Sequence, residues 1–532
     1  MNPIRILVDN VWGRFVGPDW EKIDKSKRGD DTLIKMGVFP ASLFHHFQVK
    51  DPDAHWQQMT SKFDWAPVQN FISANTGKFG IGLLGDIISF IESQGWPFEI
   101  HDTRQQLPID PDVIKADMLD SDYHLRYYQL DATKACAVYQ NGMIKKPTGS
   151  GKTLDLAALS LVFNKLADGS SPRILVLMDK KTLARQTIKQ FIKYGIAETD
   201  LACVVGQSEK AKPSPYTWNE EKVEKGARIV VAIRQMIHVL KDAMPTFDVL
   251  LMDEAHHASS TDNRKLLAAA KNARVRLGFS GTPFSGHPID DMYRRSLFGP
   301  VIYEISTAQL IKEEFLAKPF IKFIDVQRRD STMFNAMGYK EVYEAGIVDF
   351  DFRNYLIAKI ARNMAGRTLI LFLRIRHGEM LMRKLGAPGR PEANNTDPYL
   401  LHNKKTDQLI YVPEVPVFYL DGDWGVKYRE KVVKQYNAQH HAILLASPIF
   451  DEGVDLPGVN TLIVAGGEKS YVKTIQRLGR ALRPNNSGIV YVWDFWDGSH
   501  DILQRHSLDR HVIWGTEGHN VEVIKLMRED GN

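Results

Sequence analysis

The sequence predicts an α/β protein built on two parallel sheets, with a smaller α+β domain before them. From about residue 125 onward, short apolar runs alternate with helical patterns, as in RILVLMD at 173–179 and FDVLLMDE at 247–254. Runs that are apolar throughout indicate parallel strands covered by helices on both faces. The same alternation returns after Pro300, in segments such as TLILFL at 368–373. The two blocks therefore predict two separate sheets.

Three domains are expected from this organisation. An accessory domain at 1–120 has shorter, mixed segments and one amphipathic helical pattern around 82–94. The two sheet domains are expected at 121–305 and 306–532. A stretch near 385–416 is rich in Pro, Asn and Gly and interrupts the second block, so we expect it to form a surface insertion.

The composition is that of a globular protein in a reducing compartment. Of the 532 residues, 44% are apolar and 25% are charged, which excludes a disordered chain or a coiled coil. The two cysteines, Cys136 and Cys203, are too few for a disulfide framework or a four-cysteine zinc site. Uninterrupted apolar runs stay below the roughly 18 residues that indicate a membrane span. We therefore expect a soluble, cytoplasmic protein that does not contact a membrane.

Positive charge is concentrated in the middle of the chain. The net charge is +4, but residues 121–300 contain 26 Lys and Arg against 18 Asp and Glu, whereas residues 1–120 contain 12 against 17. A basic middle third favours a polyanionic partner, although a solvated surface with a chance bias explains the charge more simply.

The segment PTGSGKT predicts a phosphate-binding loop. Gly149 and Gly151 let the backbone pack closely around phosphate groups, and the N–H groups then point at the anion at the start of the following helix. Lys152 adds a positive charge toward the β- and γ-phosphates, and the Thr153 hydroxyl can ligate Mg²⁺. The full pattern has glycine where this sequence has Lys146, so a chance glycine turn before a helix is the alternative. The predicted nucleotide-binding residues of the loop are Pro147, Thr148, Gly149, Ser150, Gly151, Lys152 and Thr153.

An acidic pair farther along the chain predicts the rest of a hydrolytic site. Asp253 and Glu254 follow the apolar segment DVLLM, and carboxylates at the end of a buried strand are costly unless a cation meets them. Asp253 can hold Mg²⁺ through water, and Glu254 can take a proton from an attacking water. The alternative is the acidic start of a helix. Together with the loop, the pair predicts a nucleotide hydrolase.

Three later segments indicate what the hydrolysis drives. They are SGTPF at 280–284, FDEGVDLP at 450–457 and QRLGRALRP at 476–484. In the third, Gln476, Arg480 and Arg483 are spaced i, i+4 and i+7, so a helix places them on one face. Arg477 points elsewhere. Two guanidinium groups on one face suit the charge that develops on a γ-phosphate, and a solvated basic face is the alternative.

In this order and spacing, PTGSGKT, DEAH, SGTP and QRLGRALR closely resemble the motifs of superfamily 2 helicases and translocases. The resemblance covers about residues 120–515 and implies two RecA-like motor domains, with ATP and Mg²⁺ bound in the cleft between them. LRYYQ at 125–129 resembles the segment with which this family reads adenine. The likeness implies that Arg126 and Gln129 contact the nucleotide, with Gln129 at the adenine edge.

The same resemblance implies further roles. Ser280 and Thr282 would couple the nucleotide state to the strand-binding surface, and His256 would link them to the hydrolytic motif. Asp455 would lie near the ribose. Gln476, Arg480 and Arg483 would act in catalysis. The sequence departs from the family at two places: Lys146 stands where a small residue is usual, and SGTP stands where many members have SAT or TATP. Because SGTP keeps both hydroxyl groups, we expect the coupling to survive.

The segment NTGKFGIGLLGDIISFIESQGWPFEIHDTR at 75–104 resembles one found upstream of the motor in phage UvsW-type branch-migration DNA helicases and related bacterial helicases. The C-terminal YVWDFWDGSHDILQRHSLDR also resembles the tail of that group. This likeness implies DNA as the partner, forked or four-way rather than plain single strands, and a bacterial or phage-infected cell. The negative charge of 1–120 does not favour such a role, but a basic cluster at 25–28 could contact phosphates.

We therefore expect an ATP-dependent DNA helicase or translocase, which hydrolyses ATP to move on and remodel branched DNA in recombination, repair or replication. Three alternatives stay open: a double-strand DNA translocase that does not separate strands, an RNA helicase, and a nucleotide-gated binding module without useful turnover. Intact Lys152, Asp253 and Glu254 argue against the last. The sequence makes no prediction of protein partners.

Overall fold

The chain divides into two compact units in the computed structural model. One unit comprises residues 1–146 and 151–305, and the other comprises residues 306–532 with the loop Pro147–Ser150. None of the helices in the described part of the chain has the length and apolar character needed to cross a membrane. The residues that the structure describes are 3–17, 38–52, 68–104, 106–120, 122–163, 171–206, 226–326, 338–387, 402–403, 408–409, 415–447, 458–467, 487–516 and 519–525.

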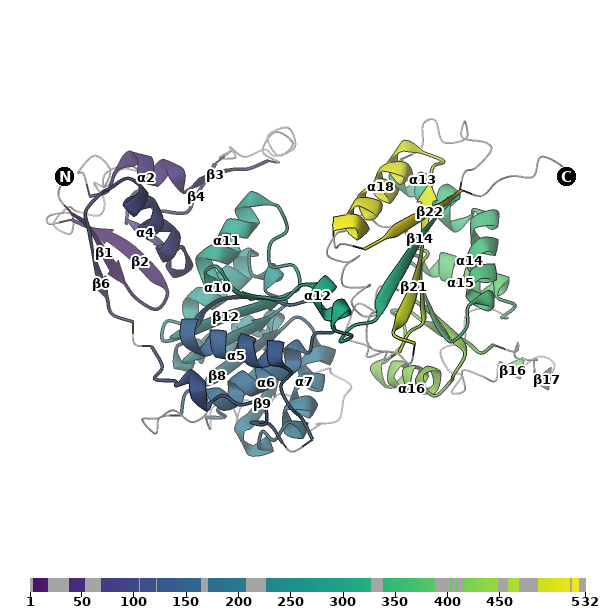
Figure 1. The fold of residues 1–532 in the computed structure, drawn as a ribbon, viewed down its shortest axis with the longest axis horizontal. Helices are drawn as coiled ribbons and strands as arrows, with labels where there is room; N and C mark the ends of the chain where they lie inside the picture. The colour runs from purple at the N-terminus through teal and green to yellow at the C-terminus, as the bar shows by residue number, and fades with distance from the viewer. Residues whose placement is uncertain are drawn as a thin grey trace. The chain divides into compact units, whose positions relative to one another are not determined.

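The first unit begins with a small α+β region around a mixed four-stranded sheet (Figure 1). β1 pairs antiparallel with β2 and parallel with β6. Buried and exposed residues alternate along β1, so one face of this sheet packs on a core and the other faces solvent. The strand order is β5 (Lys78–Gly80), β2 (Trp12–Val16), β1 (Ile4–Val8) and β6 (Phe98–Asp102).

Two helices share a core with this sheet. The amphipathic pattern at 82–94 forms a 3₁₀ turn, Ile81–Leu83, followed by α4, Leu84–Ser93. α4 turns Ile87 and Ile91 toward the core. The remaining elements of this region are α2 (Ala41–His46) and the antiparallel pair β3 (Gln48–Lys50) and β4 (Val68–Asn70).

The first large sheet has seven parallel strands in the order β13-β7-β12-β11-β8-β10-β9. Along β8, Ile174 and Val176 join one core cluster, whereas Leu175 and Leu177 join another. Both faces of the sheet are therefore covered, as the apolar run at 173–179 predicts. The strands are β7 (Asn141–Lys145), β8 (Ile174–Met178), β9 (Leu201–Val204), β10 (Ile229–Ile233), β11 (Val249–Asp253), β12 (Val275–Ser280) and β13 (Val301–Glu304). The helices are α5 (Tyr127–Tyr139), α6 (Lys152–Val162), α7 (Lys181–Lys193), α9 (Ile237–Leu240), α10 (Thr261–Ala269) and α11 (Pro288–Phe298).

The N-terminal α+β region packs directly onto this sheet domain. Arg276 is buried on β12 and donates from Nε to the Asn10 carbonyl oxygen at 3.0 Å. Asp86 on α4 forms an ion pair with Arg295 on α11. A Cβ atom at Gly82 would lie 2.0 Å from the Arg295 carbonyl oxygen, so this close approach requires glycine. The region and the first sheet domain are thus held together within one unit.

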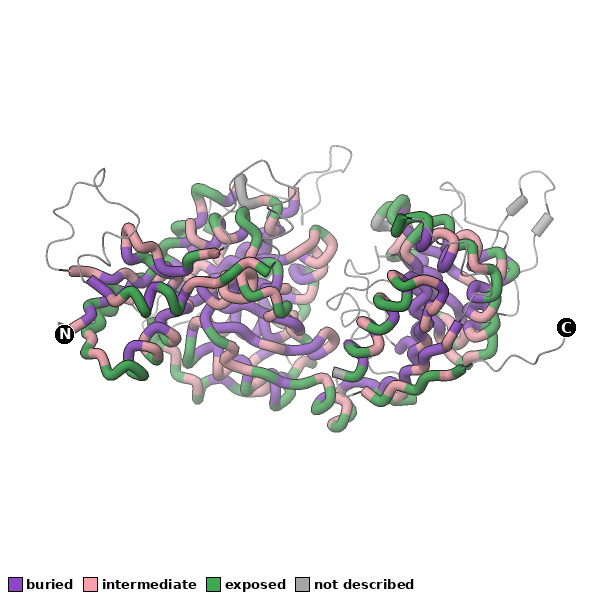
Figure 2. The backbone as a smooth tube through the Cα atoms, turned by 90° about the horizontal axis from the view of Figure 1, so that it is seen from above, coloured by how far each residue is buried: buried purple, intermediate pink, exposed green. Residues whose placement is uncertain are grey.

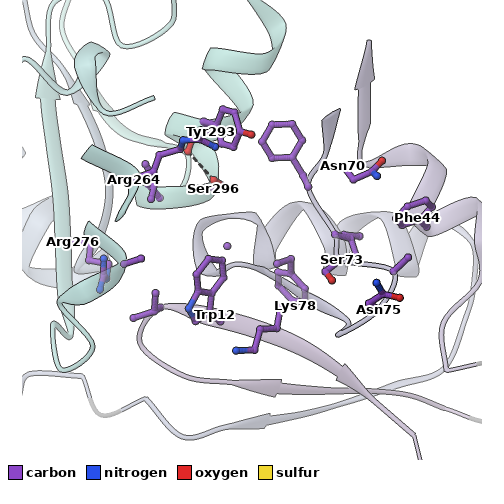
Figure 3. A pocket seen from close by; sticks show the side chains of 18 residues that line it. Trp12, Phe44, Asn70, Ser73, Asn75, Lys78, Arg264, Arg276, Tyr293 and Ser296 are labelled. Carbon is purple, nitrogen blue, oxygen red and sulfur yellow. Dashed lines mark hydrogen bonds between the residues drawn. The ribbon is translucent and has the colours of Figure 1, made fainter. Parts of the chain in front are cut away.

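A cavity of about 790 Å³ lies at this junction (Figure 3). Tyr293 of α11, in its wall, contacts Phe71 with 4.8 Å between ring centroids, and the Arg264 guanidinium lies 3.6 Å from the Tyr293 ring centroid. Lys78 and Arg264 both line the cavity, and neither forms an ion pair with a carboxylate in the described part of the chain. The cavity therefore presents positive charge beside an aromatic wall.

The second large sheet also has seven parallel strands, in the order β18-β19-β15-β20-β21-β14-β22. Its strands are β14 (Lys318–Val326), β15 (Arg367–Leu371), β18 (Val417–Leu420), β19 (Ala442–Ala446), β20 (Thr461–Val464), β21 (Ile489–Asp497) and β22 (Val521–Lys525). The helices are α12 (Thr307–Lys312), α13 (Tyr339–Tyr343), α14 (Asp351–Asn363), α15 (Ile375–Lys384), α16 (Val426–Asn437) and α18 (Asp501–Thr516). Within 385–416, β16 (His402–Asn403) and β17 (Gln408–Leu409) form a short antiparallel pair.

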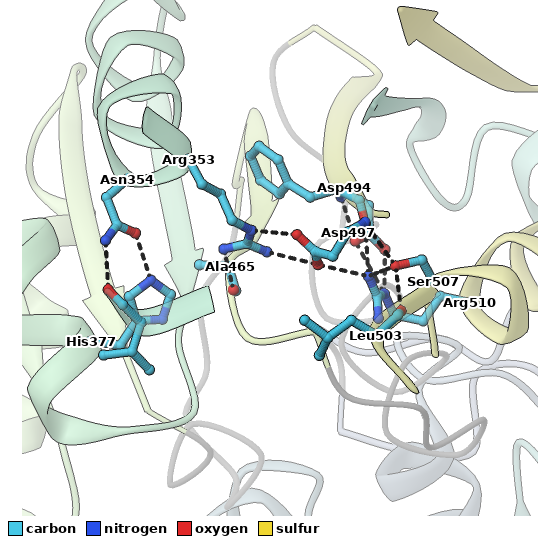
Figure 4. A network of polar contacts seen from close by, with 11 residues as sticks. Arg353, Asn354, His377, Ala465, Asp494, Asp497, Leu503, Ser507 and Arg510 are labelled. Carbon is cyan, nitrogen blue, oxygen red and sulfur yellow. Dashed lines mark hydrogen bonds and ion pairs between the residues drawn. The ribbon is translucent and has the colours of Figure 1, made fainter. Parts of the chain in front are cut away.

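Two buried arginines tie α14 and α18 to β21 (Figure 4). Arg353 donates from Nε to Asp497 at 2.8 Å and from Nη1 to the Ala465 carbonyl oxygen at 2.8 Å. Arg510 donates from Nε to Asp494 at 3.0 Å. Removing one member of such a buried pair costs about 3–5 kcal/mol, because the other charge is left without a partner. The C-terminal helix is therefore part of the core of the second sheet domain.

The two parallel sheets and the N-terminal α+β region confirm the predicted fold class. Buried residues run through the interior of each unit, and exposed residues follow its outer segments (Figure 2). Strands β8, β10, β11, β19 and β20 are buried along their whole length, as their apolar runs predict. The strands β13, β14, β21 and β22 also carry exposed or half-buried residues.

Candidate ATP-hydrolysis site

The predicted phosphate loop connects β7 to α6. Gly149 and Gly151 have φ values of 89° and 84°, in the left-handed region that other residues occupy only at a cost. A Cβ atom at Gly151 would also lie 2.4 Å from Nε2 of Gln129, so a side chain there would require Gln129 to move. α6 begins at Lys152, and backbone N–H groups at the start of a helix can bind an anion.

The predicted cation and the predicted base lie close together. Lys152 Nζ is 3.8 Å from Glu254 Oε1, although the two residues are far apart in the sequence. Glu254 has a φ of 49°, which costs roughly 1–3 kcal/mol for a residue other than glycine. This conformation also excludes the alternative in which the acidic pair simply starts a helix, since only a 3₁₀ turn, Ala255–His257, follows.

Asp253 meets the requirements for a residue that helps to hold a metal ion. Its carboxyl group is buried at the end of β11, and its Oδ1 atom has no hydrogen-bond partner in the described part of the chain. Burial, together with the adjacent Glu254, raises the pKa of Asp253 to about 6, although Lys152 opposes the shift. A buried carboxylate oxygen without a partner fits the oxygen ligands that Mg²⁺ prefers. The second predicted ligand, Thr153, is on the first turn of α6.

A complete protein cage for a metal is not present among the residues that the structure describes. No three His, Cys, Asp or Glu side chains converge there. Mg²⁺ commonly binds through one or two protein groups, waters and phosphate oxygens, so the pair Thr153 and Asp253 fits Mg²⁺ bound together with a nucleotide.

The predicted coupling residues are joined to the acidic motif by short polar contacts. His256 Nδ1 lies 3.3 Å from Glu254 Oε2 and 3.1 Å from Ser280 Oγ. Ser280 Oγ accepts a hydrogen bond from the Thr282 backbone N–H at 3.1 Å. Arg294, which the sequence analysis did not single out, holds this turn from α11 by donating to the His256 carbonyl oxygen at 2.8 Å. A continuous path therefore runs from Glu254 to Thr282.

Gln129 links the start of α5 to the end of the phosphate loop. Its Oε1 atom accepts from the Arg126 backbone N–H at 2.9 Å, and its Nε2 atom lies 3.5 Å from the Gly151 carbonyl oxygen. The side chain of Arg126 donates from Nη1 to the Tyr128 hydroxyl at 3.1 Å. The contacts of Gln129 and Arg126 with a nucleotide stay predictions.

Four predicted site residues lie outside the described residues: Asp455, Gln476, Arg480 and Arg483. The shared helical face in 476–483, with Arg477 on another face, therefore stays a prediction.

Lys146, which departs from the loop pattern, has a partner that was not predicted from the sequence. Lys146 Nζ donates to Asp155 Oδ2 at 2.5 Å, and both side chains are almost completely buried. A signal was present, because Asp155 is the charged residue within the otherwise apolar helix segment LDLAALSLV.

Two parallel-sheet domains, a glycine loop before a helix, and an acidic pair beside the helix's lysine define the class of ATP-dependent motor proteins. Residues 122–285 match the family described as type III restriction enzyme, res subunit, and residues 393–485 match the helicase conserved C-terminal domain. Together, the two matched domains are consistent with a superfamily 2 helicase and support an ATP-dependent helicase activity.

Named relatives agree with this family. The chain is 22% identical to the ATP-dependent DNA helicase uvsW of Enterobacteria phage T4, over 79% of each chain. It is 23% identical to the DNA 3'-5' translocase XPB2 of Sulfurisphaera tokodaii, over 74% of this chain and 88% of the relative. The solved structure of the ATP-dependent type ISP restriction-modification enzyme LlaBIII bound to DNA superposes with a TM-score of 0.55 at 15% identity, over 76% of this chain and 32% of that one, which supports the fold alone.

Proposed function

We propose that the chain hydrolyses ATP with the residues of the candidate site and uses the energy to move on branched DNA. The observation that carries this proposal is the convergence of Lys152 Nζ and Glu254 Oε1 within 3.8 Å. A cation for the transferred phosphate and a carboxylate for the attacking water must lie this close for one ATP molecule to meet both.

The proposed division of labour follows from the chemistry of each group. Lys152 and backbone N–H groups at the start of α6 bind the phosphates. Thr153 and Asp253 hold Mg²⁺, which neutralises phosphate charge when it is bound. Glu254 accepts a proton from the attacking water. His256 contacts Glu254, so a change at Glu254 that depends on the bound nucleotide is transmitted through His256 and Ser280 to Thr282.

Residues of the second sheet domain complete the proposal. Arg480 and Arg483 supply positive charge in the transition state, assisted by Gln476, and Asp455 contacts the ribose. Gln129 and Arg126 contact the adenine side of the nucleotide. All of these assignments rest on the motif resemblance. For Gln476 and the two arginines there is a further argument, because an i, i+4, i+7 spacing on a helix gives the three residues one common face.

Branched DNA is the proposed substrate because of the N-terminal region, for which we propose the boundary at residue 120. That region is fixed to the first sheet domain by Arg276 and by the pair Asp86–Arg295, so it can present DNA to the motor at a constant place. The cavity at the junction is lined by the cations Lys78 and Arg264 beside aromatic rings, and neither cation pairs with a carboxylate among the described residues; such a lining is the chemistry that binds phosphates and stacked bases. The two relatives named above are a DNA helicase and a DNA translocase, which supports DNA over RNA.

A reducing compartment, such as the cytoplasm of a bacterial or phage-infected cell, is proposed as the place of action, in recombination, repair or replication. Cys136 and Cys203 are both buried free thiols, which supports such a compartment.

The proposal is tested by measuring how different nucleic acids stimulate ATP hydrolysis at one salt concentration, since salt changes all such affinities. We expect four-way junctions and forks to stimulate more than linear duplex or single strands, and RNA to stimulate little. Equal stimulation by linear duplex without strand separation would instead favour a double-strand translocase, and stimulation by RNA alone would favour an RNA helicase.

A further inference from the structure

A lysine that no catalytic step uses is buried next to the candidate site. Lys146 directly follows β7, and its side chain is fully buried. Its Nζ atom donates to Asp155 Oδ2 at 2.5 Å, and Asp155 is also buried, on α6 one turn after Lys152. Taking two charges out of water costs several kcal/mol per ion, so this pair must be held in good geometry to be tolerated.

The Lys146 ammonium nitrogen and the Asp155 carboxylate oxygen lie 2.5 Å apart, which is the short separation typical of a charge-assisted hydrogen bond.

Lys146 also contacts the two other segments of the site. Its Nζ atom lies 4.9 Å from the centroid of the buried Tyr128 ring, on the first turn of α5. Its backbone N–H donates to the Ser280 carbonyl oxygen at 3.0 Å. Lys146 therefore touches α5 near Gln129, α6 near Lys152 and the end of β12 at Ser280.

We infer that Lys146 is a positioning residue, whose ion pair with Asp155 fixes the first turn of α6 and so directs Lys152 toward the nucleotide phosphates. The inference rests on the proposed ATP site. Lys146 does not reach the nucleotide itself, because its side chain is fully enclosed and its ammonium group is engaged by Asp155 and Tyr128.

A purely stabilising role is the competing explanation, and a double substitution separates the two. Removing one member of a buried ion pair is strongly destabilising, whereas replacing both by apolar residues of similar size is often neutral or stabilising. The double variant Lys146→Met with Asp155→Leu should therefore fold. If the pair positions α6, this variant keeps its melting temperature but hydrolyses ATP more slowly. The reason is that an apolar contact does not hold the first turn of α6 so that Lys152 points toward the phosphates.

The experiment measures kcat and KM for ATP, with saturating junction DNA, well below the melting temperature. We expect kcat of the double variant to fall roughly 10- to 100-fold, as displacements of about 1 Å in a site can do, with a smaller change in KM. Lys145→Met is the matched control. The neighbouring Lys145 forms an exposed pair with Glu304 at 2.6 Å, so its loss should leave kcat within twofold of the original protein.

The outcomes separate this inference from the proposed function. A double variant with the original kcat and melting temperature would overturn the positioning role. If the double variant does not fold, Lys146→Gln with Asp155→Asn takes its place, because two amides can hydrogen-bond to each other without a buried charge. An unchanged kcat in that variant would show that the ionic contact does not direct Lys152, and it would overturn the inference equally. Failure of the original protein to hydrolyse ATP, or normal hydrolysis by Lys152→Ala, would instead refute the proposed function.

Discussion

His256 Nδ1 lies 3.1 Å from Ser280 Oγ, and this contact joins the turn that follows the acidic pair to the strand that precedes Thr282. Ser280→Ala removes the shared hydroxyl and leaves both His256 and the Thr282 N–H without this partner. We expect ATP binding to stay near its original level and DNA-stimulated hydrolysis to fall roughly tenfold, the effect of about 1.4 kcal/mol in the transition state. Steady-state ATPase assays with and without DNA check this.

The control for this prediction is Ser260→Ala. Ser260 is exposed just before α10 and makes no side-chain capping hydrogen bond, so its loss should change little. A Ser280→Ala variant with full DNA stimulation would show that the hydroxyl contact does not transmit the nucleotide state.

The buried His377 predicts loss of stability in acid. Its Nε2 atom lies 2.9 Å from Asn354 Oδ1 (Figure 4), and burial, with Arg353 nearby, lowers its pKa to about 3. In the unfolded chain a histidine has a pKa of about 6.5. The stability that neutral His377 contributes is therefore complete above pH 6.5 and is lost as the pH falls toward 3. This one group should remove about 1.4 kcal/mol of stability by pH 5.5. Urea unfolding at pH 7.5 and 5.5 measures the loss, and His377→Gln should reduce the difference between the two pH values.

The cavity at the junction with the N-terminal region predicts a charge-dependent DNA contact. Lys78→Ala and Arg264→Ala should each weaken binding to a four-way junction and lower the dependence of log affinity on log salt by about one unit, as the loss of one phosphate contact does. Lys265→Ala is the control, because Lys265 is exposed, adjacent to Arg264 and outside the cavity lining. Junction titrations at several salt concentrations compare the three variants, and an equal response to Lys265→Ala would place the DNA elsewhere.

The predicted arginine face is tested by turnover. Arg480→Ala and Arg483→Ala should each lower kcat far more than ATP affinity, since an arginine that meets the transferred phosphate contributes roughly 10³ or more to the rate in related phosphoryl transfer. Arg477→Ala should be milder, because a helix directs it elsewhere. Similar losses at all three positions, measured by single-turnover hydrolysis, would contradict the helical-face argument.

Local pattern was enough to predict much of this protein. The apolar run before Asp253 predicts a buried strand, and the glycines before Lys152 predict a tight turn. Patterns of this local kind were sufficient to predict the two sheets and the hydrolytic motifs. Contacts between distant segments were not visible in that way. The ion pair of Lys146 with Asp155 and the hydrogen bond from Arg276 to Asn10 could not be predicted from residue spacing, because each depends on how buried elements pack against one another.

If Lys152 and Glu254 form one ATP-hydrolysing site driven by DNA, their variants should differ in parallel measurements of ATP binding and turnover. Lys152→Ala should lose most binding or turnover, because the phosphates lose their cation. Glu254→Gln should bind ATP with near-original affinity, because only the proton acceptor changes, while its junction-stimulated turnover falls by at least about 10². Glu254→Gln that hydrolyses ATP at the original rate would contradict the account.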